Sequence, residues 1–170
     1  MGMEIYIYAR VVRKSDKKTV TIGCLEEEWA HCSELEREYF GVCWWRKDYE
    51  MLEFLMKTAS QYGIEIDDTK THGTFPLPME AMREIYAGIV KRSCYDIPED
   101  EPDDIRIERV WAEYQNIKNA HALYCILSAI ETKSYGLWED VLEWHLCEEA
   151  ELEEFKQPDN FQWEFLVSWG

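Results

Sequence analysis

The longest uninterrupted helical pattern in the chain covers residues 103–133, and it constrains the fold more than any other stretch. Pro102 and two aspartates mark its start, where carboxylates are favoured by the positive end of the helix dipole. Residues 119–130 (NAHALYCILSAI) are apolar almost all round. Because a helix that is apolar on every side is normally buried, we expect a central helix with the other segments wrapped round it.

The two ends of the chain carry strand patterns. Residues 4–12 alternate between faces and are rich in β-branched and aromatic side chains, which predicts a hairpin with residues 19–22. The C-terminal run 161–169 (FQWEFLVSW) is predicted to pair with this hairpin. Helical spacing of apolar residues predicts helices over 25–39, 48–62, 79–89 and 137 to about 155. The expected fold is a single α+β domain over residues 1–170, mostly helical, with a small antiparallel sheet formed by the N-terminal hairpin and the C-terminal strand.

The net charge of the chain indicates which classes of partner it can bind. The 170 residues include 35 acids and 18 Lys or Arg, which gives a formal net charge of -17. Small soluble domains need a net charge of magnitude only about 2 to 8, and a larger excess destabilises the folded state by self-repulsion. DNA, RNA and anionic membranes attract the opposite sign, so direct binding to them is disfavoured. The composition instead favours a basic protein as the partner.

Cysteine usage and hydropathy indicate the compartment. The six cysteines are scattered, with no CxxC pair, and the N-terminus shows no signal-peptide pattern. No apolar run approaches the roughly 18 residues that a membrane span needs. We therefore expect a cytoplasmic protein with reduced thiols.

The strongest functional signal is a run of carboxylates near the C-terminus. Between Glu139 and Glu154 there are eight acids and no Lys or Arg. In a helix this run is roughly 24 Å long, with about one charge per 3 Å, against about one per 3.4 Å along a DNA strand. Such a helix is expected to occupy the basic groove of a partner such as a nucleic-acid-processing enzyme. The alternative is a solvated outer face of an ordinary amphipathic helix. The predicted partner-binding residues are Glu139, Asp140, Glu143, Glu148, Glu149, Glu151, Glu153 and Glu154, with Asp100, Glu101, Asp103 and Asp104 before the long helix.

One resemblance accompanies this signal. The run Leu137-Trp138-Glu139-Asp140, continuing through Leu142, Glu143, Leu146 and Glu148 to Phe155, resembles the acidic C-terminal helix of the anti-restriction DNA-mimic proteins of short-tailed phages. The resemblance implies an inhibitor that occupies the DNA-binding groove of a restriction enzyme. The layout of a Tyr-rich opening strand and a closing strand that ends in Ser168-Trp169 is also similar to small uncharacterised phage proteins, which implies a phage or mobile-element origin.

Two alternative functions use other residues. Trp44 and Trp45 could form the aromatic surface of an interaction or immunity-type module, whose acidity would serve only solubility. A small enzyme could use His72, which lies on a polar loop near Asp67 and Asp68. The chain contains no GxGxxG, GxxxxGK[ST], GxSxG or HExxH motif, so we assign no catalytic residue and expect no nucleotide cofactor.

A metal site is not expected either. His121 and Cys125 are four residues apart on the long helix, and His145 and Cys147 follow on the next one. On a helix, an HxC spacing turns the two side chains about 200° apart, which a single ion would not accept.

Overall fold

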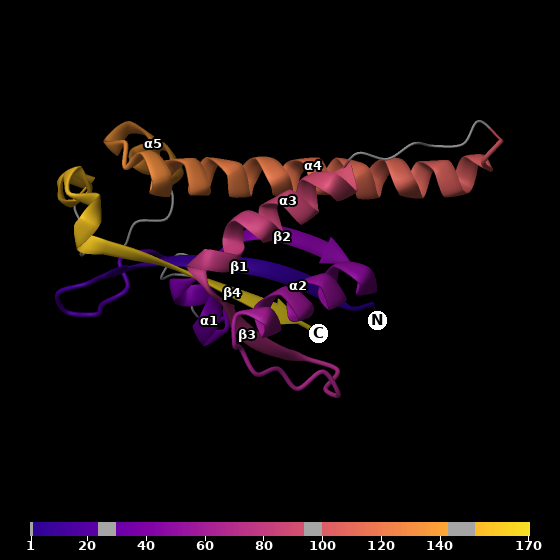
Figure 1. Cartoon of the computed structure of the whole chain (residues 1–170), viewed down its shortest axis with the longest axis horizontal. Helices are drawn as coiled ribbons and strands as arrows, with labels where there is room; N and C mark the ends of the chain where they lie inside the picture. The colour runs from indigo at the N-terminus through magenta and orange to yellow at the C-terminus, as the bar shows by residue number, and fades with distance from the viewer. Residues whose placement is uncertain (1, 24–29, 94–99, 143–151) are drawn as a thin grey trace.

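The computed structural model describes residues 2–23, 30–93, 100–142 and 152–170 of the 170 (Figure 1). It confirms the predicted α+β class, with helices packed on a four-stranded antiparallel sheet. Its elements, in chain order, are β1 (Glu4–Arg13), α1 (Glu34–Glu38), β2 (Phe40–Arg46), α2 (Tyr49–Gln61), β3 (Gly73–Leu77), η2 (Met79–Ala81), α3 (Met82–Ser93), α4 (Asp103–Thr132), α5 (Tyr135–Leu142), η3 (Leu152–Lys156), η4 (Pro158–Asn160) and β4 (Phe161–Trp169).

The sheet has the strand order β2-β1-β4-β3. Its centre is the pairing of the two chain ends, from Ile5 opposite Trp169 to Arg13 opposite Phe161, as the alternating patterns predict. Every second side chain of β1 and β4 is buried, because successive side chains of a strand point to opposite faces. The buried side chains form one core with those of the helices.

The outer strands differ from the prediction. Residues 19–22, predicted as the second strand of a hairpin, contribute only an isolated bridge between Thr19 and Val12. The neighbour of β1 is instead β2, which was expected to be the end of a helix and a loop. The helix predicted over 25–39 is seen only as α1, and residues 24–29 lie outside the described residues. On the other edge, β3 lies between the loop that carries His72 and the helix predicted over 79–89, where no strand was predicted.

Local signals predict two of the helices well. The side chain of Asp48 accepts a hydrogen bond from the backbone N–H of Met51 at 3.0 Å and so caps α2. Gly63, at φ 88°, follows this helix in a conformation that other residues rarely adopt. η2 and α3 begin after Pro78, as expected, with Met82, Ile85 and Ile89 buried.

The long helix α4 has the predicted bounds but not the predicted surroundings. It runs along one edge of the molecule rather than through its centre (Figure 1). Its described contacts are mainly with α3, β2 and α5. Within the segment expected to be apolar and buried on every side, the Tyr124 side chain is 55% exposed. The other segments therefore cover one side of this helix instead of wrapping round it.

Two buried asparagines fasten α4 to β2. The Asn119 side chain accepts a hydrogen bond from the Trp44 backbone N–H at 3.1 Å and donates one to the Trp44 carbonyl at 2.8 Å. Asn116 accepts a hydrogen bond from Trp45 Nε1 at 2.8 Å. Since buried polar groups are costly without partners, these bonds fix the position of the helix along the strand.

An aromatic cluster holds α5 and η3 to the C-terminal end of α4. The Trp138 ring lies 5.6 Å from both Phe155 and Trp163, centroid to centroid, and Phe155 stacks on Phe161 at 4.4 Å. Trp138 Nε1 also donates a hydrogen bond to the Ala129 carbonyl of α4 at 2.7 Å. The acidic residues on either side of this cluster are therefore held near the C-terminal end of α4.

Candidate acidic interaction surface

One group of predicted site residues lies at the N-terminal end of α4. Asp103 and Asp104 occupy its first turn, and both are exposed, as is Asp100. The first-turn amides and the helix dipole stabilise negative charge at this position. Three carboxylates are thus held at a defined end of the helix and remain accessible to a partner.

Glu101 differs from its neighbours. Its side chain is only 6% exposed and pairs with Arg109 Nε at 2.6 Å, nearly two turns into the helix. Because a buried carboxylate is costly without its partner, the pair with Arg109 anchors the entry to α4. It contributes little charge to the outer surface.

The second group lies at the other end of α4. On α5, Asp140 is exposed and Glu139 is half-buried. Glu143, Glu148, Glu149 and Glu151 lie outside the described residues, and the structure describes only the backbone of Glu153. The continuous helix predicted to about residue 155 is described as α5 at its start and as η3 at its end.

Glu154, the last predicted site residue, pairs within the chain. Its carboxylate accepts hydrogen bonds from Arg13 Nε at 3.2 Å and Nη2 at 3.0 Å. Arg13 also donates to Asp16 at 2.9 Å, and these two carboxylates raise the pKa of the guanidinium. These ion pairs neutralise Arg13 and fasten η3 to the end of β1.

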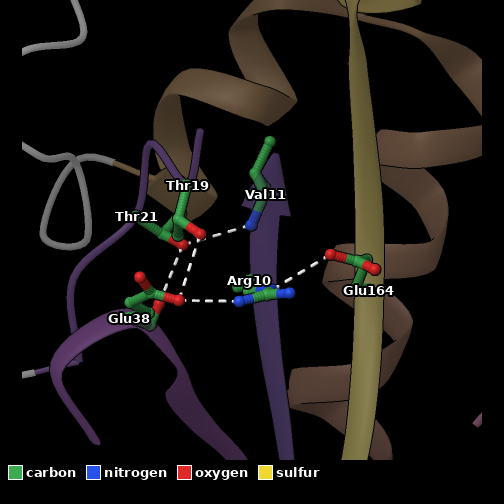
Figure 2. A network of polar contacts seen from close by, with 6 residues as sticks. All are labelled: Arg10, Val11, Thr19, Thr21, Glu38 and Glu164. Carbon is green, nitrogen blue, oxygen red and sulfur yellow. Dashed lines mark hydrogen bonds and ion pairs between the residues drawn. The ribbon is translucent and has the colours of Figure 1, made fainter. Parts of the chain in front are cut away.

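Much of the basic charge in the described residues is used in this way. Figure 2 shows Arg10 between Glu38 and Glu164, with donor-acceptor distances of 2.6 and 3.0 Å. Thr19 donates to the same Glu38 carboxylate at 3.2 Å, and Thr21 connects the Glu38 carbonyl to the Val11 backbone N–H. Basic residues that make ion pairs in the described part of the chain include Arg10, Arg13, Arg83, Arg92, Arg109 and Lys133. Since acids outnumber bases by 17, these pairs leave a large excess of carboxylate charge.

The two acidic groups are far apart. At about 1.5 Å per residue, the 30 residues of α4 span roughly 45 Å. α5 lies at one end of α4 and the aspartates of its first turn lie at the other (Figure 1). A partner that contacts both groups needs basic sites separated by about this distance, which corresponds to roughly 13 base pairs of B-DNA at about 3.4 Å each.

The aromatic alternative loses one of its two residues. Trp45 is 3% exposed and lies in the core, so it cannot form part of an exposed surface. Trp44 points to the other face of β2 and is half-buried. Tyr8 lies on the same face of the neighbouring strand β1 and is also half-buried. Burial and the charge of Glu36 raise the pKa of its hydroxyl to about 12.

The loop that carries His72 borders a small cavity of about 360 Å³, lined also by Glu65, Asp67 and Lys70. His72 is exposed, and its only hydrogen bond among the described residues joins Nδ1 to the Thr71 hydroxyl at 3.4 Å. Asp67 accepts hydrogen bonds from Thr69, which lower the pKa of its carboxyl. In the part of the chain that the structure describes, no carboxylate is hydrogen-bonded to the His72 ring to orient it for catalysis.

The metal candidates come together only in part. His121 Nε2 and Cys125 Sγ lie 3.7 Å apart on α4, whereas His145 and Cys147 fall outside the described residues. In residues 2–23, 30–93, 100–142 and 152–170, no group of three or more potential ligands is placed to hold a metal ion. Within the same ranges, no helix combines the length and the hydropathy needed to cross a bilayer.

Sequence reasoning missed one exposed feature. On α4, Trp111 is 66% exposed and Ile107 is 58% exposed, although both are large apolar residues. Their signal in the sequence is an alternation of three- and four-residue steps between apolar positions. Comparison with protein-family models, with curated proteins and with solved structures found no match.

Proposed function

We propose that this protein inhibits a basic partner protein by placing carboxylates on the surface with which the partner binds nucleic acid. The observation that carries the proposal is the placement of exposed acids at both ends of α4, with Asp100, Asp103 and Asp104 at one end and Asp140 at the other. A basic surface built for phosphates attracts such carboxylates over a long range and speeds the encounter.

The resemblance of residues 137–155 to the acidic helix of phage anti-restriction proteins favours a restriction enzyme, or another nucleic-acid-processing enzyme, as the partner class. In this proposal the protein is encoded by a phage or mobile element. The acids with intramolecular partners, Glu101 and Glu154, hold the framework, while the exposed aspartates make the contacts.

The experiment uses the full chain as bait in a host lysate, with competition by double-stranded DNA. A partner of the proposed kind binds at about 50 mM salt, is released at about 300 mM, and is displaced by a duplex longer than about 13 base pairs. A partner that DNA does not displace would contradict the proposal.

A matched pair of variants then tests the site against the partner captured in this way. Replacing Asp100, Asp103 and Asp104 by Asn should weaken binding about 5- to 30-fold, because exposed charge contacts are each worth roughly 0.3–0.7 kcal/mol. The control replaces three exposed acids elsewhere, Glu53→Gln, Glu65→Gln and Asp68→Asn, and removes the same net charge. Equal losses in both variants would show that only total charge matters and would exclude a defined site at this end of α4.

A further inference from the structure

The outer side of α4 exposes a row of large apolar side chains, which we call the α4 stripe. All six are at least half exposed: Ile107, Val110, Trp111, Tyr114, Ile117 and Tyr124. With aromatic side chains of roughly 150–250 Å² each, the stripe presents on the order of 700 Å². Soluble monomers rarely expose a contiguous apolar patch of more than a few hundred Å², so a patch of this size indicates a binding surface.

The spacing of the stripe is that of a two-helix contact. Positions 107, 110, 114, 117, 121 and 124 are separated alternately by three and four residues, with the exposed His121 as the one polar member. This period of 3.5 residues keeps a seam on one side of a helix that pairs with another helix. The seam lies opposite Asn116, Asn119 and Leu123, which face the rest of the molecule and are buried. Among the described residues, the Tyr86 ring of α3 lies 6.1 Å from the Tyr124 ring, and the rest of the seam, from Ile107 to Ile117, is left open.

We propose that a second copy of this chain covers the α4 stripe, with the two α4 helices antiparallel. One antiparallel register uses the whole stripe. It places Ile107 against Tyr124 of the second copy, Val110 against His121, and Tyr114 against Ile117. The two-fold axis relates the two copies, so each of these pairs occurs twice in the dimer. Such self-complementary contacts are the commonest way in which soluble proteins form dimers.

Charge favours this occupant and this direction. Positions 107–124 contain two acids (Glu108, Glu113) and two bases (Arg109, Lys118), and since Arg109 is paired with Glu101 the local excess is about one negative charge, although the chain as a whole carries -17. Two copies can therefore approach along this segment with little local repulsion. The antiparallel register places the first-turn aspartates beside the C-terminal end of the second α4, near Glu131, which is already paired with Arg83, whereas a parallel pair would bring the aspartates of both copies together.

The side of the seam supplies a further contact. Lys118 Nζ already lies 5.6 Å from the centroid of the Tyr114 ring. In the antiparallel register it comes next to Trp111 of the second copy, where a cation-π contact is favourable. The area of roughly 700 Å² from each copy approaches the roughly 800 Å² per partner of a standard stable interface.

The first test measures the mass of the full-length protein by sedimentation equilibrium between about 1 and 100 µM, at 50 and 300 mM salt. A reversible dimer is expected. It should be as strong or stronger at high salt, because screening reduces the repulsion between two acidic chains. Binding of the partner in the proposed function weakens with salt, whereas the dimer does not. The two proposals are therefore tested independently of each other. A monomer throughout this range would overturn the proposed dimer.

Two isoleucines on the same helix give a matched pair of variants. Ile107 lies on the stripe, whereas Ile105, 42% exposed, projects to the other side of α4. Ile107→Glu should raise the dissociation constant of the dimer at least 30-fold, because each of the two copies then brings a carboxylate into the apolar seam. Ile105→Glu should change it less than threefold, and far-UV circular dichroism should show both variants folded. Equal effects of the two changes would overturn the assignment of the seam.

A photo-cross-linking residue in place of Ile107 tests the direction. Irradiation of the dimer, followed by mass spectrometry, should join position 107 to the peptide that contains Tyr124 of the second copy. A link from position 107 to the peptide around position 107 of the second copy would show a parallel pair and overturn the antiparallel arrangement.

Discussion

The two halves of α4 share one backbone but have opposite environments. In residues 103–115 no side chain is buried, whereas six buried side chains fall between 116 and 129. The C-terminal half packs on β2, α3 and α5, and the N-terminal half continues past them (Figure 1). Since isolated helices are marginal in water, the difference teaches that the C-terminal half supplies the stability, while the side chains of the N-terminal half remain accessible among the described residues.

The largest contrast is expected from removing a side chain in each half. Leu123→Ala should lower the free energy of unfolding by about 3 kcal/mol, because it leaves a cavity in the core. Tyr114→Ala, at about 1 µM protein where few copies are paired, should change it by less than about 0.5 kcal/mol. Urea unfolding followed by circular dichroism measures both. Similar losses would contradict the contrast between the halves.

A slightly smaller effect is expected where the packed half holds β2. Asn119→Ala leaves the Trp44 backbone N–H and carbonyl without their partners and should cost about 2 kcal/mol in the same unfolding experiment. The control is Gln115→Ala, which removes one half-buried hydrogen bond to Asn119 and should cost about 0.5 kcal/mol. If the two variants lose equal stability, the contact with Trp44 is not what secures the helix.

Cysteine reactivity sharpens the comparison without weakening the fold. Cys43 lies beneath the packed half, where its Sγ is 3.6 Å from the Asn119 carbonyl, and burial raises the pKa of its thiol. Because the thiolate is the reactive form and a raised pKa lowers its fraction at pH 8, Cys43 should react with iodoacetamide at least 10-fold more slowly than the half-buried Cys125. Peptide mass spectrometry gives both rates. Equal rates would mean that this part of the helix separates readily from the strand.

The smallest effect is expected at the exposed end. Replacing Asp103 and Asp104 by Asn removes charges that favour the start of the helix and should destabilise its first turns by about 0.5 kcal/mol. Hydrogen exchange of the amides of residues 106–110, at about 1 µM protein, should become about twofold faster. Glu131→Gln, at the other end of α4, serves as the control and should leave these amides unchanged. Unchanged exchange in the double variant would exclude a role of these aspartates in helix stability.

Sequence patterns correctly predicted the helices and strands whose formation depends on neighbouring residues in the chain. Strand alternation predicted β1, β4 and their pairing, and an N-cap with a terminal glycine predicted α2. β2 and β3 were missed for physical reasons. β2 follows a helical pattern and contains Gly41, and β3 contains Pro76, which lacks the donor that strands normally use. Both become strands because a neighbouring strand offers hydrogen bonds.

The sequence predicts which acidic residues could form the candidate site, but it does not predict how they are arranged in space. The acidic positions at both ends of α4 are visible in the sequence, but the engagement of Glu154 depends on Arg13, which is 141 positions away. The stripe was hidden for a related reason. The exposed apolar side chains of the stripe and buried apolar side chains such as Leu123 lie on opposite sides of α4, so the sequence predicts a helix that is apolar all round until the extent of the sheet is known.

The side chain of Asn119 has a consequence for aggregation. An open strand edge is a template on which other chains can add strands. β2 and β3 form the two edges of this sheet. At β2, the amide of Asn119 occupies the backbone N–H and carbonyl of Trp44 as a further strand would. At β3, Pro76 offers no N–H at all. Growth of the sheet by addition of another copy is thus obstructed at both sides, which leaves the helical surface as the place where copies can meet without polymerising.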